Sequence, residues 1–146
     1  MAHNAHTSDF RFEVPAGWVD RTMIAWSAPP KPGERVAPNV LVAYDALQHG
    51  EDLAGYVNRQ LKQLMEKARK FQLDLRQDTA LAGRPAIEVL FQWDSTTGVL
   101  KQRQIYTLLS DGRAATFVHT AAAANFEKAE PHFAEMMKSF TWNPAD

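Results

Sequence analysis

The stretch FRFEVPAGWVDRTMIAW, residues 10–26, contains two predicted strands of different character, joined by a sharp turn. Its first part, Phe10–Val14, alternates apolar and charged side chains, as a strand does when one face is buried. Pro15–Trp18 has the composition of a turn. The second strand, predicted over 19–27, contains the apolar run Met23–Trp26, so both of its faces need cover. We expect the core to cover one face and a partner to cover the other.

The rest of the chain adds one strand before a helix and four strands after it. A third strand is predicted over 39–47, after a proline-rich loop, and 51–70 has the apolar stripe of an amphipathic helix. Because proline is excluded from helix interiors, the last helix is predicted to start near Pro131. Alternating segments predict the four remaining strands over 71–79, 86–93, 99–109 and 113–121. This order predicts an α+β fold, an antiparallel twisted sheet of about seven strands with the helices packed on one side.

Composition and charge limit the possible classes of function. A chain of 146 residues, 45% apolar and 23% charged, predicts one domain over 1–146, with residues 1–8 as a flexible N-terminal arm. The net charge of −1 provides no general attraction to nucleic acid. The absence of cysteine excludes disulfides and thiolate chemistry. Without a signal peptide or an apolar stretch of ~20 residues, the sequence predicts a cytoplasmic protein with no membrane insertion.

The residue types that commonly carry catalysis form no motif in this sequence. No serine lies in a Gly-x-Ser-x-Gly elbow, and no glycine-rich loop opens a helix. His119 lies on a predicted strand and is interpreted as a packed or hydrogen-bonded residue, although a cluster of His119 with carboxylates in a cleft would favour an enzyme. None of the five histidines has a metal-ligand spacing to another. We therefore predict no enzymatic activity, no metal and no cofactor.

The strand over 99–109 has no clearly exposed face. One explanation is that the helices, the proline-rich loop or a second subunit cover both faces of the sheet. The other is a groove for an apolar segment, in which glutamine amides would donate and accept hydrogen bonds without adding a charge. We expect one apolar sheet surface with embedded amides, formed by Ile24, Trp26, Leu100, Gln102, Gln104 and Tyr106.

The predicted order of elements and three short motifs together resemble a known family of domains. The motifs are FEVPAGWVDRTM at 12–23, AGRPA at 82–86, and a closing pattern made by Pro131, Phe133, Ser139 and Phe140. With these features the chain resembles the DcrB-like and PsbP-like domains. Lacking a signal peptide or a lipobox cysteine, it is most similar to the cytoplasmic Eag-type chaperones of type VI secretion effectors.

The resemblance implies a homodimeric chaperone that shields the N-terminal transmembrane helices of an effector and aids its loading onto the secretion spike. The family's groove residues fall here on Ile24, Trp26 and Leu100, and its groove glutamines on Gln60 and Gln104. With a helix residue and a second strand amide added, the predicted client-binding set is Ile24, Trp26, Gln60, Leu64, Leu100, Gln102 and Gln104. The alternative is a small hydrophobic-ligand-binding or structural PsbP-like domain with no role in secretion.

Overall fold

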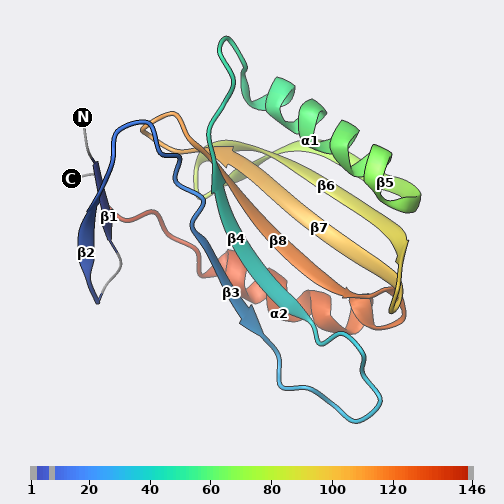
Figure 1. Ribbon diagram of the computed structural model, residues 1–146. Helices are drawn as coiled ribbons and strands as arrows, with labels where there is room; N and C mark the ends of the chain where they lie inside the picture. The colour runs from blue at the N-terminus through green and yellow to red at the C-terminus, as the bar shows by residue number, and fades with distance from the viewer. Residues whose placement is uncertain (1–2, 7–8, 145–146) are drawn as a thin grey trace.

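Six strands of the computed structural model, which describes residues 3–6 and 9–144, form one antiparallel sheet (Figure 1). The order across the sheet is β3-β4-β8-β7-β6-β5. Helix α1 (Leu53–Lys67) follows β4, and the 3-10 helix η1 (Ala123–Asn125) leads from β8 into α2 (Phe126–Lys138). The predicted α+β class and antiparallel sheet are confirmed. The strands are β3 (Met23–Ser27), β4 (Asn39–Asp45), β5 (Arg69–Leu81), β6 (Arg84–Ser95), β7 (Gly98–Leu108) and β8 (Ala114–Ala122).

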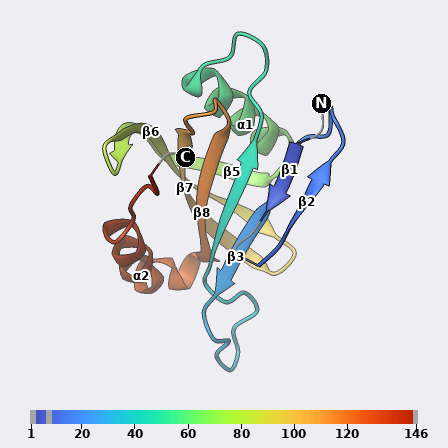
Figure 2. The ribbon, with the colours of Figure 1, turned by 90° about the vertical axis from the view of Figure 1, so that its left-hand side faces the viewer.

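The first predicted strand forms a separate two-stranded sheet. Strand β2 (Arg11–Val14) pairs antiparallel with β1 (His3–His6) and does not join β3 (Figure 2). The connection over 15–22 is too long for a tight hairpin turn, which would keep consecutive strands paired. Strand β3 therefore forms an edge of the main sheet and pairs with β4. Residues 1–2 and 7–8 of the predicted flexible arm lie outside the described residues.

The two helices lie on opposite faces of the sheet, and the expectation that both pack on one side is wrong. Helix α1 packs through Val57 and Leu61 on Val89 and its neighbours. Helix α2 packs through Phe133 on Phe117 and other residues that face the opposite way. The reason is that β8 is buried along nearly its whole length, so each of its faces needs its own cover. Figures 1 and 2 show the sheet between the two helices.

Helix α1 is anchored at its first turn. The Asp52 side chain accepts a hydrogen bond of 2.8 Å from the Gly55 N–H, which satisfies a donor that the helix leaves free. The Tyr56 hydroxyl donates to Asp45 Oδ2 over 3.0 Å and ties this end of the helix to β4. The predicted helix is confirmed, with bounds shorter than 51–70 by a few residues at each end.

Helix α2 begins earlier than predicted and contains Pro131 in its second turn. The missing N–H would have bonded to the carbonyl of Glu127, four residues before. Both residues are exposed, so water can satisfy that carbonyl. The opposite side of the helix buries three residues spaced by three and four, Phe126, Ala129 and Phe133, and this packing outweighs the lost bond.

Candidate functional site

Helix α1 leaves part of its own side of the sheet uncovered. It packs on β5, β6 and β7, whereas no helix lies in front of β4 and the adjoining part of β8 in the described structure (Figure 1). Gln104 of β7 pairs with Val118 of β8, and Val118 pairs with Leu41 of β4. Paired residues point to the same face of a sheet, so these three side chains lie on the face that α1 partly covers. Val118, Thr120 and Gln104 are buried, while Leu41 and Gln102 are partly exposed. We call this uncharged surface the open face: Leu41, Ala43, Leu100, Gln102, Gln104, Val118 and Thr120.

A row of hydrogen bonds orients the amides of the open face. The Tyr106 hydroxyl donates to Gln104 Oε1, and Gln104 Nε2 donates to Gln102 Oε1 over 2.8 Å. Burial raises the pKa of Tyr106, so its hydroxyl keeps the proton it donates. Each of the two carbonyl oxygens accepts one hydrogen bond within the row, and the Gln102 amide N–H groups end it. These N–H groups can donate to carbonyl or hydroxyl oxygens of a bound molecule.

Two predicted residues lie on α1 beside the open face. Leu64 packs against the apolar cluster beneath the helix. Gln60 lies one turn after Tyr56, whose hydroxyl bonds to Asp45 of β4, so both lie on the edge of α1 that faces β4. On the opposite edge of the helix, Asn58 accepts a hydrogen bond of 2.5 Å from Arg76 of β5. The half-buried Gln60 is thus on the edge of α1 nearest the open face.

Ile24 and Trp26 do not share this surface in one chain. Their register partners on β4 are Val42 and Val40, which belong to the apolar cluster on the α2 side. Because side chains alternate along the strand, Met23 and Ala25 point to the side of the open face, whereas the prediction placed Ile24 and Trp26 there. Leu100, Gln102, Gln104 and Tyr106 share one surface as predicted, and the placement of Ile24 and Trp26 beside them is wrong. The two are 42% and 59% exposed, so strand β3 lacks cover on both faces.

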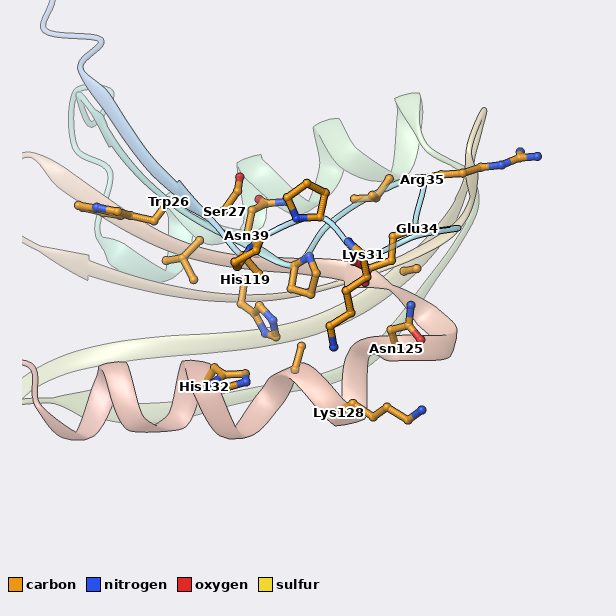
Figure 3. Close-up of a pocket in the computed structure, with 18 of the residues that line it drawn as sticks. Trp26, Ser27, Lys31, Glu34, Arg35, Asn39, His119, Asn125, Lys128 and His132 are labelled. Atoms are coloured by element: carbon orange, nitrogen blue, oxygen red, sulfur yellow. Dashed lines mark hydrogen bonds between the residues drawn. The ribbon is translucent and has the colours of Figure 1, made fainter.

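Two cavities lie on the α2 side, where sequence analysis predicted none. The larger, about 980 Å³, lies between the loop 28–38 and α2, and we call it the loop–helix cavity (Figure 3). The smaller, about 650 Å³, has Ile24, Trp26 and Trp142 in its walls. Prolines 29, 30, 32 and 38 marked the loop as irregular, but nothing local indicated that it would stand over the last helix.

A partly buried ionic network holds α2 to the sheet beside the larger cavity. Arg103 donates to Glu130 Oε1 through Nε (2.8 Å) and Nη2 (2.6 Å), and His119 Nδ1 lies 3.2 Å from Glu130 Oε2. The His119 ring stacks between Phe126 and Phe133 at centroid distances of 4.8 and 5.2 Å. In the described part of the chain Glu130 is its hydrogen-bond partner, and no hydroxyl nucleophile joins the pair. This geometry suits a structural anchor, as the sequence predicted for His119.

The stability of the protein should fall as the pH drops below about 6.5. Burial lowers the pKa of His119 from its ordinary value of 6.5, against the opposing effect of Glu130. Between the folded and unfolded pKa values the unfolded chain therefore binds more protons, so acid favours unfolding in that range. We expect urea unfolding at pH 7.5 and 5.5 to show this loss in the wild type and a smaller loss in His119→Phe. His132→Gln, at an exposed histidine, is the matched control and should keep the wild-type difference. An unchanged difference in His119→Phe would contradict the prediction.

Residues 3–6 and 9–144 contain no cluster of three His, Cys, Asp or Glu side chains placed to hold a metal ion. Across the same described residues, none of the helices combines the length and the apolar character needed to cross a membrane.

Comparison with known proteins adds a family to this geometry. The family model described as DcrB matches residues 10–139. Effector EagT6 of Pseudomonas aeruginosa is 26% identical over 144 residues, which are 97% of this chain and 96% of that protein. The predicted resemblance to DcrB-like domains and to Eag-type proteins is confirmed.

Solved structures share the fold. A protein of unknown function, PA94 from Pseudomonas aeruginosa, superimposes with a TM-score of 0.83 at 22% identity and covers 99% of both chains. LpqN, involved in cell envelope biogenesis of Mycobacterium tuberculosis, gives 0.66 at 13% identity, covering 99% of this chain and 91% of LpqN. Cyanobacterial PsbP (CyanoP) from Synechocystis sp. PCC 6803 gives 0.55 at 14% identity, covering 97% and 92%. The predicted likeness to the PsbP fold is confirmed.

Proposed function

Because the chain belongs to the DcrB family, we propose that it is a cytoplasmic, non-enzymatic chaperone for a type VI secretion effector. It binds the apolar N-terminal transmembrane helices of that effector and aids loading onto the secretion spike. The observation that carries the proposal is the open face, a sheet surface without charge in which apolar side chains flank a row of oriented amides. The likeness to Effector EagT6 supports the link to secretion effectors.

The chemistry of the open face matches such a client. A transmembrane helix of ~20 apolar residues aggregates in water unless it is covered. Covering several hundred Å² of it at ~25 cal/mol per Å² contributes on the order of ten kcal/mol before the cost of association. The free N–H groups of Gln102 would pair with serine or threonine hydroxyls, or with carbonyls near a helix end, and so select a register. Apolar contact alone would bind the helix without orienting it.

We place the homodimer interface at the free edge of β3. This strand is exposed at all five residues, and its sequence MIAWS has neither the charge nor the proline that commonly blocks an edge. Antiparallel pairing of two β3 strands would continue the sheet across two copies and bring their open faces together. Each copy would also gain cover for the apolar side chains of Met23, Ile24 and Trp26, which are exposed in the single chain.

The test of the function is co-expression with the N-terminal region of the effector encoded beside this chain. Size-exclusion chromatography with light scattering should show a soluble complex that contains two copies of the chaperone. An aggregated effector beside a free, unchanged chain would overturn the proposal and favour a ligand-binding or structural domain with no role in secretion.

Ala25→Pro should convert the dimer into a monomer. The Ala28 N–H bonds to the Pro38 carbonyl, so the even-numbered residues of β3 direct their backbone groups toward β4 and Ala25 directs its own outward. Proline therefore removes a donor from the free edge and leaves the β3–β4 ladder intact. Light scattering should give about 16.4 kDa for this variant, the mass of one chain. Ala25→Val, which keeps the N–H, should stay dimeric, and a dimeric Ala25→Pro would place the interface elsewhere.

A further inference from the structure

We propose that the loop–helix cavity binds an anionic amphiphile, a molecule with an apolar chain and one acidic headgroup. The cavity lies on the α2 side of the sheet, away from the open face, so the proposal does not depend on client binding. Its volume of about 980 Å³ is at the upper end of the range of about 300–1,000 Å³ common for small-molecule sites.

The cavity has a built apolar floor. Val40, Ala129 and Phe133 are buried there, and His119 lies among them with its ring held between two phenylalanines. Trp26 and Met136 add large apolar side chains that are 59% and 44% exposed in the walls. The apolar chain of a ligand on this floor would shield Trp26 and Met136 from water. This burial of apolar surface would supply the affinity for the chain.

The headgroup end carries positive charge that has no ion-pair partner among residues 3–6 and 9–144. Lysine, arginine and glutamate side chains in the lining comprise three cations, Lys31, Arg35 and Lys128, and one carboxylate, Glu34. Glu34 accepts a hydrogen bond of 3.0 Å from the Lys31 backbone N–H, which stabilises the turn of the loop between these residues. None of the three cations forms an ion pair with the described residues.

The charge and the apolar surface are arranged from one end of the cavity to the other. Figure 3 shows Trp26 at one end and Lys31, Asn125 and Lys128 at the other, with Arg35 directed away. Glu130, whose carboxylate contacts His119 of the floor, is not part of the lining and forms an ion pair with Arg103, which also contacts Glu88 over 3.4 Å. A ligand would therefore lie with its acid between Lys31 and Lys128 and its chain toward Trp26, since cations beside apolar walls attract an anion more strongly than cations in open water.

The test is titration with dodecanoate below its micelle concentration, followed by calorimetry and by tryptophan fluorescence. We expect saturable binding of dodecanoate, at least tenfold weaker binding of hexanoate, and no binding of dodecyltrimethylammonium. The double variant Lys31→Glu, Lys128→Glu should weaken dodecanoate binding at least tenfold. Lys62→Glu, Lys67→Glu makes the same change of charge on exposed residues of α1 and should leave it unchanged.

Equal binding of the two twelve-carbon probes would overturn the assignment of the headgroup, because it would show that the tail alone is bound. Equal loss in the two double variants would also overturn it, because a general effect of net charge would then explain the result. No binding of dodecanoate would overturn the site itself. Leu100→Glu, on the opposite face, should bind dodecanoate like the wild type, so that this result is separate from any result with the effector client.

Discussion

Leu100→Glu should abolish binding of the apolar client, at least a hundredfold loss, while the chain stays folded. Leu100 is half-exposed on the open face in line with Gln102 and Gln104, so a carboxylate there would have to lose water against an apolar helix. The charge can remain hydrated in the free chaperone, which is why the fold should survive. The measurement is capture of the co-expressed effector region, with circular dichroism and thermal melting of the free variant. A variant that retains the client would show that the open face is not the binding surface.

Ile24→Glu is the matched comparison, since the sequence places Ile24 and Leu100 in one groove and the structure separates them. Ile24 points to the α2 side, together with Val42. Compared at a concentration where light scattering shows that the variant is still dimeric, the glutamate variant should retain the client within about threefold, whereas a single groove would require both variants to fail. Loss in Ile24→Glu with retention in Leu100→Glu would move the client to the α2 face.

Phe91→Ala should have the largest effect on stability, a loss of about 3–5 kcal/mol in the free energy of unfolding. Phe91 is fully buried under α1 and packs on the rings of Phe71 and Trp93 at centroid distances of 5.1 and 5.6 Å. Removal of the ring leaves a cavity between three elements that cannot collapse around it. The loss is a large part of the roughly 5–15 kcal/mol that holds a typical domain folded, and the melting temperature should drop by about 10–16 degrees.

Met65→Ala is the control for this variant. Met65 lies on the outer side of α1, 62% exposed, and its truncation should cost less than about 0.5 kcal/mol. Urea unfolding of the three proteins measures both values. Equal losses in the two variants would contradict the assignment of the core beneath α1.

Local periodicity was sufficient to predict most elements of the fold. The stripe through Val57 and Leu61 predicted α1, and the alternation along 86–93 predicted β6, because helix and strand periods depend on neighbouring residues alone. The exposed apolar run of β3 was also visible in the sequence. Pro131 misled the prediction because the rule against proline in helices describes the local cost and ignores the apolar contacts of Phe126 and Phe133 that offset it.

The sequence by itself therefore determined the order and type of most elements and the apolar character of both faces of β3, whereas the expectation that the core covers one of these faces is wrong, since all five residues of β3 are exposed. Only the tertiary structure decided which face each side chain occupies. A strand period of two makes the face of Ile24 depend on register across β4, β8 and β7, and a shift of one residue at any of these pairings would reverse it. The network of His119, Arg103 and Glu130 and the loop–helix cavity arise in the same way, from contacts between residues distant in the chain. No local pattern records such contacts, because their free energy depends on which elements meet and in which register.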